Sequence, residues 1–232
     1  MTQSSQASIN ALPLGDKSLL SLQLIATLAI LAFVPGNSWK LICFVAIWIV
    51  TTRRISLKEL ACYIGVCILF SVMDIMAVRQ RVFSFSHPDI AGLPIWEFFM
   101  WGFFVLHTLR MLNGPPSATK PLGVLPLAIV MALPFMIITE QGWLLIAATA
   151  ALAFGLIFFH ERDDLKYVGY MVLVGALFEY TGVWSNQWGY PGNPPGGVPF
   201  WFVAMWGGVG LYARRLLSPL IGARDNPSSR PL

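Results

Sequence analysis

The sequence predicts an all-α, polytopic integral membrane protein with about eight transmembrane helices, arranged as two parallel four-helix repeats. Composition is the first of three observations behind this prediction. Hydrophobic residues make up 56% of the chain, charged residues only 11%, and the mean hydropathy is +0.68. A soluble domain of 232 residues could not cover so much apolar surface with so few charges, so the chain is expected to lie in lipid.

The spacing of the apolar runs is the second observation. One run is short, so its helix could be tilted, buried among its neighbours or partly re-entrant. Each run is expected to form one transmembrane helix. The runs of roughly bilayer length lie near residues 18–35, 38–52 (the short one), 60–78, 93–112, 122–139, 142–159, 167–183 and 198–216.

Basic residues predict how these helices are oriented. If the N-terminus is cytoplasmic, only Lys40, Arg79 and Arg81 of the fifteen Lys and Arg residues face outward. Such a bias is typical of membrane proteins. We therefore expect a multi-pass protein of the cell membrane, with both termini in the cytoplasm and the loops 79–92 and 184–197 on the outer side. The inner basic residues are Lys17, Arg53, Arg54, Lys58, Arg110, Lys120, Arg162, Lys166, Arg214, Arg215, Arg224 and Arg230.

An internal repeat is the third observation. Residues 74–112 align with residues 179–217 without a gap, at a constant offset of 105, and ten of the thirty-nine positions are identical. Gly, Pro and Trp carry much of the match. Four helices per unit is an even number, so both units enter the membrane in the same direction. The expected organisation is a polar N-terminal tail (1–17), a first repeat (18–116), a second repeat (117–217) and a C-terminal tail (218–232).

Each unit carries an aromatic loop that ends in Gly-x-Pro-x-Trp, at residues 92–96 and 197–201. Proline suits the first turn of a helix, and glycine allows the sharp turn before it. Trp and Tyr favour the membrane interface, so these aromatic residues could be interface anchors only. Alternatively they bind a substrate, with residues 82–85 folded back as a lid. The candidate substrate-binding residues are Trp96, Trp101, Phe83, Phe85, Trp184, Trp188, Tyr190, Trp201 and Trp206.

Three acidic residues lie near the outer ends of the predicted helices. Asp74 and Glu179 occupy matching positions in the repeat, whereas Glu97 has Phe202 as its counterpart. A carboxyl group within a span is costly unless it is paired or faces a cavity, which makes these residues catalytic candidates. The repeat should bring the three groups together, where they cannot all be ionised, and a protonated acid beside an ionised one suits acid–base catalysis. The alternative is structural pairing with Arg79, Arg81 or a loop amide, which would hold the two units together.

Other polar residues receive lesser roles. His87 and Asp89 in the first loop, with Asn186 in the second, are possible auxiliary residues of the acidic site. His107 lies toward the inner side and is expected to pack rather than to react. Cys43, Cys62 and Cys67 lack metal-ligand spacing and are interpreted as packing residues.

Missing motifs narrow the chemistry further. The sequence has no cluster of histidine pairs, no Gly-rich dinucleotide loop and no Gly-x-Ser-x-Gly elbow. We therefore expect redox-neutral chemistry without a cofactor or a metal, and no nucleic-acid partner.

The order of these motifs resembles the lycopene cyclase domain of carotenoid pathways. That family combines a span-terminal Asp, a Phe/Trp-x-aromatic loop and a Pro-x-Glu-Glu motif; here these are Asp74, Phe83-Ser84-Phe85 and Pro94-Ile95-Trp96-Glu97. Trp96 stands where the first acid of the Glu pair belongs. The second unit is also similar to the carotenoid hydratase family, through its Glu, Gly and Gly-Val-Pro elements.

The resemblance implies an intramembrane enzyme that acts on a hydrophobic isoprenoid by protonation, with cyclisation, hydration or isomerisation as the outcome. Glu97 or Asp74 would supply the proton, Glu179 would act as a base or stabilise the cation, and aromatic rings would shield it. A proton-coupled transporter or a lipid-binding membrane protein is the alternative function, with membrane lipids as partners in either case.

Overall fold

The computed structural model describes residues 14–52, 55–118, 121–158 and 160–221. Each predicted apolar run overlaps one of the described α-helices, in agreement with the all-α prediction. The eight main helices are α1 (Leu14–Phe33), α2 (Asn37–Thr52), α3 (Leu57–Arg79), α4 (Glu97–Leu112), α5 (Pro121–Ile137), α6 (Gln141–Phe158), α7 (Asp164–Trp184) and α8 (Trp201–Tyr212).

Short elements complete the described chain. Two-residue strands β1 (Ser84–Phe85) and β2 (Trp188–Gly189) lie in the loops before α4 and α8, and a 3-10 turn, η1 (Pro195–Gly197), follows β2. After α8 the chain continues as a π-helical segment, η2 (Ala213–Leu217), and a last short helix, α9 (Ser218–Ile221).

Three of the described helices are long and apolar enough to cross a membrane. Their candidate spans are Asp16–Phe33 in α1, Leu57–Arg79 in α3 and Gln141–Phe158 in α6, whereas α2 and α5 are shorter apolar helices. Membrane association therefore follows from these helices. The expected start of α4 near residue 93 is too early by about a turn, because Gly92 adopts a positive φ and helical hydrogen bonding begins only after Pro94.

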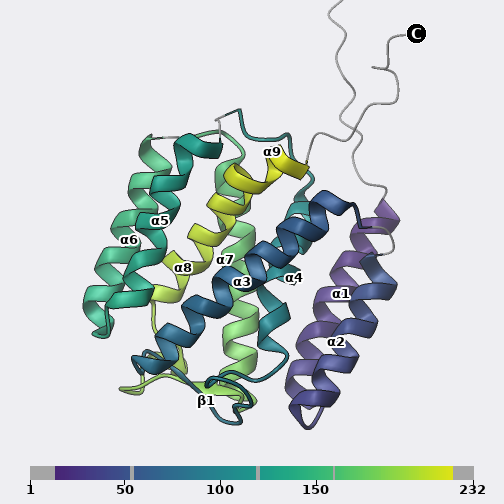
Figure 1. Cartoon of the computed structure of the whole chain (residues 1–232), viewed down its shortest axis with the longest axis vertical. Coiled ribbons are helices and arrows are strands. Elements are labelled where there is room, and N and C mark those ends of the chain that lie inside the picture. Colours follow the sequence, from purple (N-terminus) through teal and green to yellow (C-terminus); the bar gives the residue numbers. More distant parts are fainter. Residues whose placement is uncertain (1–13, 53–54, 119–120, 159, 222–232) are drawn as a thin grey trace, which may run out of the picture.

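The helices pack as pairs around a central group. In Figure 1, α3, α4, α7 and α8 lie in the middle of the molecule, with α1 and α2 on one side and α5 and α6 on the other. The α1–α2 pair contacts α7, while the α5–α6 pair contacts α3 and α8. The strands and both aromatic loops lie at the end of the molecule opposite α9 (Figure 1).

The two aromatic loops join each other at that end. β1 pairs with β2 in antiparallel register, so that Ser84 lies opposite Gly189 and Phe85 opposite Trp188. Each loop leaves its helix through a residue in the left-handed region, Arg81 at φ 60° and Asn186 at φ 57°. The resulting two-stranded ribbon covers the loop end of α3, α4, α7 and α8.

Buried ion pairs tie the opposite end together. Glu59, at the start of α3, accepts hydrogen bonds from the Ser56 N–H (2.8 Å) and from Arg110 Nε (3.0 Å). Asp164, at the start of α7, accepts bonds from the Glu161 N–H (2.8 Å) and from Arg215 Nε (3.1 Å). The second set of contacts repeats the first at an offset of 105 residues.

Some predictions lie outside the described residues. These are the inner-side assignments of Arg53, Arg54, Lys120, Arg224 and Arg230, and most of the two predicted tails. α1 begins within the segment 1–17, and α9 lies within the segment 218–232.

Candidate functional site: a buried cluster of three carboxyl groups

The three predicted acids meet beneath the β1–β2 ribbon. Asp74 lies one and a half turns before the end of α3, Glu97 is the first residue of α4, and Glu179 lies in the last turns of α7. Their relative exposures are 9%, 5% and 4%. All three line a single cavity, so the prediction that the repeat brings them together agrees with the geometry.

Aromatic donors surround Glu179. Its Oε2 accepts hydrogen bonds from Trp188 Nε1 (3.0 Å) and from the Tyr190 hydroxyl (2.6 Å), and its Oε1 accepts one from Trp206 Nε1 (3.0 Å). Burial, and then the neighbouring Glu179, raise the pKa of the Tyr190 phenol well above its ordinary value, so this loop residue remains a donor. Three donors that converge on one carboxyl group suit its ionised form.

Asp74 and Glu97 form the other half of the cluster. Asp74 Oδ2 accepts a hydrogen bond from Trp101 Nε1 at 2.7 Å. Glu97 and Asp74 line the same cavity, and two neighbouring carboxyl groups can bond to each other only if one carries a proton. Glu97 Oε2 is buried without a partner in the described part of the chain. One oxygen of the cluster therefore has no hydrogen-bond partner among the described residues.

Two glycines of α7 make room for the donors of Glu179. A Cβ atom at Gly175 would lie 2.2 Å from Trp206 Cγ, and one at Gly182 would lie 1.9 Å from Trp188 Cη2. Only a hydrogen atom fits at these positions, so the indole rings rest directly on the helix backbone on either side of Glu179. The sequence analysis did not single out either glycine. The sequence feature that could have revealed them is their spacing, because Gly175 lies four residues before Glu179 and Gly182 lies three residues after it.

The cavity itself is small. Its volume is about 40 Å³, room for about three water molecules when one needs roughly 10–15 Å³. The predicted substrate-binding residues that line it are Phe83, Phe85, Trp101, Trp188, Tyr190 and Trp201, joined by Phe178 and Met205, which were not predicted.

The remaining aromatic candidates lie elsewhere. Trp206 is fully buried behind the cavity, where it bonds to Glu179 and stacks on Trp101. Trp96 donates to Asn37 Oδ1 (3.1 Å) and packs edge-on against Phe85. Trp184 is 76% exposed, because five helical residues turn it roughly 140° away from Glu179.

The auxiliary candidates form hydrogen bonds and a turn within the two aromatic loops. Asp89 Oδ2 accepts hydrogen bonds from Asn37 Nδ2 (2.8 Å) and the Ile95 N–H (2.9 Å), and the His87 carbonyl oxygen accepts from the same Asn37 amide (2.7 Å). Asn186 provides the left-handed turn before β2. None of the three lines the carboxyl cavity. Structural pairing of the acids with Arg79 or Arg81 is not among the contacts of the described residues.

The described residues hold no group of three His, Cys, Asp or Glu side chains arranged to bind a metal ion. The partners of Asp74 and Glu179 in the carboxyl cluster are indole and phenol donors.

His107 has more than the packing role expected from the sequence. It is 2% exposed, with Nδ1 3.1 Å from Gln23 Oε1 and Nε2 2.8 Å from the Tyr170 hydroxyl. The Gln23 amide nitrogen in turn donates to Thr51 Oγ1. This polar chain links α7, α4, α1 and α2. Its members are far apart in the sequence and share no motif, so only the tertiary structure reveals it.

Fold and site together define an all-α protein with helices able to cross a membrane and a buried acidic cluster at one end. Comparison with known proteins adds a fold relationship. No family model matches this chain, and no curated protein matches it in sequence. A crystal structure of a cross-linked trimer of an MvINS variant superposes with a TM-score of 0.65 at 12% identity, covering 75% of this chain and 99% of the MvINS chain. At this identity the similarity concerns the fold alone.

Proposed function

We propose that this protein is an intramembrane acid–base enzyme that protonates a carbon–carbon double bond or epoxide of an isoprenoid. The observation that carries the proposal is Glu97 Oε2, a carboxyl oxygen buried without a partner among the described residues, on a cavity walled by aromatic rings. A buried acid in such a pocket is a typical active-site candidate. The resemblance to lycopene cyclase and carotenoid hydratase motifs supports the same substrate class.

Each acid then has a separate role. Glu97 in its protonated form breaks its O–H bond and forms a C–H bond on the substrate, which leaves a carbocation. Aromatic rings of the lining, among them Phe178, stabilise that cation, whereas Trp101 is already stacked between Phe70 and Trp206. Glu179, ionised within its three donors, attracts the cation and accepts a proton in the final step. Loss of a proton gives a cyclised or isomerised product, whereas attack by a water gives a hydrated one, and both are redox-neutral.

The size of the cavity limits what enters it. A volume of about 40 Å³ accommodates the reacting end of a prenyl chain and not a whole isoprenoid. Phe83 and Phe85 are only half-buried and lie on the ribbon above the acids. Under this proposal they move aside when the substrate end enters, as the predicted lid.

We further propose that residues 18–116 and 117–217 are duplicated four-helix units that enter the membrane in the same direction. Recurrence of contacts at the offset of 105 supports this: Trp101 bonds to Asp74 as Trp206 bonds to Glu179, and the Arg110–Glu59 pair recurs as Arg215–Asp164. Lys58, Arg110, Lys166 and Arg215 lie at the α9 end, which supports a cytoplasmic location for that end.

Deuterium incorporation tests the chemistry whichever product is formed. The purified protein in lipid nanodiscs is incubated in D₂O with lycopene, squalene or geranylgeraniol, and the masses of the recovered lipids are measured by mass spectrometry. We expect new C–D bonds with the wild type and at least about a hundredfold less with Glu97→Gln, given the usual contribution of a general acid. Equal incorporation by both proteins, or none with any isoprenoid, would contradict the proposal.

A proton-coupled transporter is the other function consistent with three buried acids. The acids lie near the ends of their helices, beside the ribbon, rather than midway along them. Transport sites usually lie at the membrane midplane, so the position of the cluster favours the enzyme.

A further inference from the structure

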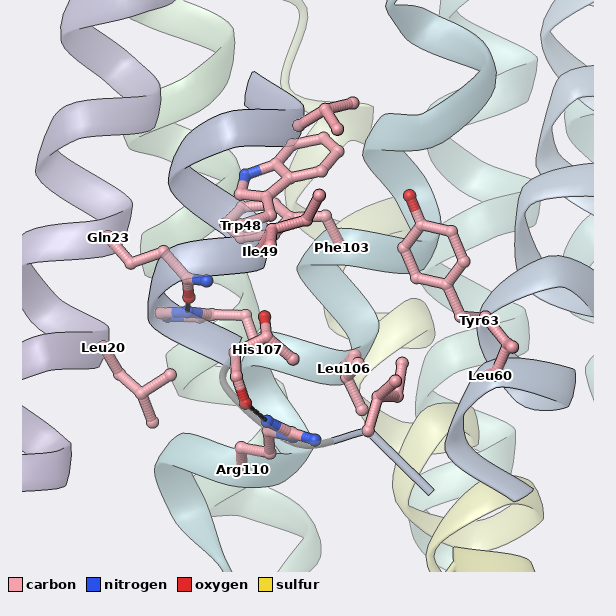
Figure 2. Close-up of a pocket in the computed structure, with 13 residues that line it drawn as sticks. Leu20, Gln23, Trp48, Ile49, Leu60, Tyr63, Phe103, Leu106, His107 and Arg110 are labelled. Carbon is pink, nitrogen blue, oxygen red and sulfur yellow. Dashed lines mark hydrogen bonds between the residues drawn. The ribbon is translucent and has the colours of Figure 1, made fainter. Parts of the chain in front are cut away.

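A second cavity, away from the carboxyl cluster, lies among α1, α2, α3 and α4 of the described chain (Figure 2). Its volume is about 280 Å³, seven times that of the carboxyl cavity and close to the lower limit of roughly 300 Å³ for small-molecule sites. Its walls are mainly apolar and aromatic. They include Leu20, Val45, Trp48, Tyr63, Phe103 and Leu106.

Bulky aromatic side chains of α2 lie beside this cavity. Phe44 and Trp48 project from α2 toward α4, where Trp48 stacks on Phe103 with ring centroids 4.4 Å apart. The corresponding helices of the second half, α6 and α8, approach closely through glycines: Gly155 meets Tyr212 and Leu211, and Gly207 meets Leu152. The second half is therefore closely packed between α6 and α8, at the place equivalent to the cavity beside α2 and α4 in the first half.

A directed hydrogen-bond chain forms the polar wall. Gln23 Nε2 donates to Thr51, so Gln23 Oε1 must accept from His107 Nδ1, and His107 Nε2 then accepts from the Tyr170 hydroxyl. The side chain of Gln23 is only 2% exposed. Figure 2 shows it among the residues that line the cavity. The second N–H of its amide has no acceptor among the described residues, although a buried donor without an acceptor is costly.

Charge at the cavity is balanced. Among the described residues of its lining, the one permanent cation is Arg110, which is paired with Glu59 through Nε and Nη2 and also bonds to the Thr52 carbonyl oxygen. His107 in its neutral form satisfies both of its neighbours. Within the described lining these charges are paired, and a neutral oxygen would satisfy the Gln23 amide.

We propose that this cavity binds a neutral amphiphile, an aliphatic or isoprenoid chain that carries a hydroxyl or carbonyl oxygen. The chain lies against Leu106 and the edges of the stacked Trp48–Phe103 pair, and the oxygen accepts a hydrogen bond from the Gln23 amide. The site is separate from the carboxyl cluster and does not depend on the reaction proposed there.

Photo-crosslinking tests the site directly. The full-length protein in nanodiscs is irradiated with a hexadecanol that carries a diazirine and an alkyne, and labelled peptides are identified by mass spectrometry. We expect labels on the faces of α2 and α4 that line the cavity. Unmodified hexadecanol should compete at least about tenfold better than hexadecane or hexadecyl phosphate. Equal competition by all three, or labels spread over all exposed helix faces, would mean adventitious lipid contact and would overturn the proposal.

Variants separate the cavity from the rest of the protein. Leu106→Trp, which fills the cavity, should reduce labelling at least about tenfold, while Val130→Trp on an exposed face of α5 should leave it unchanged. Gln23→Leu should reduce the preference for hexadecanol over hexadecane about five- to tenfold, the usual worth of one hydrogen bond. If Leu106→Trp fails to fold, the hexadecanol-to-hexadecane preference of Gln23→Leu alone tests the site. Unchanged labelling in Leu106→Trp, or an unchanged ratio in Gln23→Leu, contradicts the site.

The carboxyl cluster supplies an independent control. Glu97→Gln should label as the wild type does, even though we expect it to abolish deuterium incorporation. Loss of labelling in Glu97→Gln would show that the two cavities are one site and would refute the separate one. Failure of the deuterium experiment alone leaves the labelling result intact, so the two proposals are tested apart.

Discussion

Trp101 and Trp206 stack on each other with ring centroids 4.7 Å apart, and each donates its indole N–H to a different buried carboxyl group. The two rings come from equivalent positions of the repeat, on α4 and α8. They link Asp74 to Glu179 at the loop end of the molecule. The acids are consequently held by aromatic donors that also fill the space between them.

Removing one indole donor should destabilise the protein measurably. Trp206→Phe retains a ring for stacking but leaves Glu179 Oε1 without its hydrogen bond, which should cost about 1–3 kcal/mol of unfolding free energy. Reversible unfolding in mixed micelles measures the change. Trp143→Phe, at a ring that is 65% exposed, is the matched control and should change stability by less than about 0.5 kcal/mol. Equal effects of both changes would exclude the proposed role of the bond.

Glycine substitutions along α7 should have opposite signs. Gly175→Ala and Gly182→Ala drive a methyl group into Trp206 and Trp188, and overpacking of this kind costs about 1–3 kcal/mol or more. Gly169 lies in the same helix with open space at its Cβ position, so Gly169→Ala should stabilise the protein by about 0.5–1 kcal/mol. Thermal unfolding of the three variants checks the contrast. A stabilised Gly182→Ala variant would show that the indole does not rest on the helix.

The two ion pairs at the α9 end should differ in strength. Asp164 and Arg215 both have fully buried side chains, so Arg215→Met removes charged hydrogen bonds from a buried carboxylate and should cost about 1.5–3 kcal/mol; Arg214, 2.6 Å from Asp164 Oδ1, keeps that carboxylate paired. Arg110 is 20% exposed, and Arg110→Met should cost less because water reaches the vacated site. Unfolding midpoints of both variants, with the exposed Arg162→Met as control, measure the order. A reversed order would contradict this account.

Sidedness can be measured with impermeant reagents. Ser86 lies on the exposed ribbon and Arg162 at the start of α7, at opposite ends of the helices. With Cys43, Cys62 and Cys67 replaced by alanine, Ser86→Cys should react with an impermeant maleimide in intact cells, and Arg162→Cys only after the membrane is broken. The inverse pattern would reverse the predicted orientation.

The amino-acid sequence determined the helices, their apolar character, the repeat and the identity of the three acids that meet. Asp74 and Glu179 could be predicted as neighbours because the constant offset of 105 makes their positions equivalent. The first residues of α4 and α8 were harder to predict from the sequence, because the turns after Gly92 and Gly197 depend on backbone angles. The exposure of Trp184 also escaped prediction, since composition does not tell which face of α7 turns inward.

Only the tertiary structure decided how the space between the helices is divided. Cavity volume depends on how side chains from distant helices fit together, as Phe44 and Trp48 on α2 do against Phe103 and as Gly175 does beneath Trp206. Hydrogen bonds such as those from His107 to Gln23 and Tyr170 likewise join residues with no pattern in common. Periodicity reports local backbone geometry, whereas packing is a property of the whole chain, and for that reason the acids were predictable and the cavities were not.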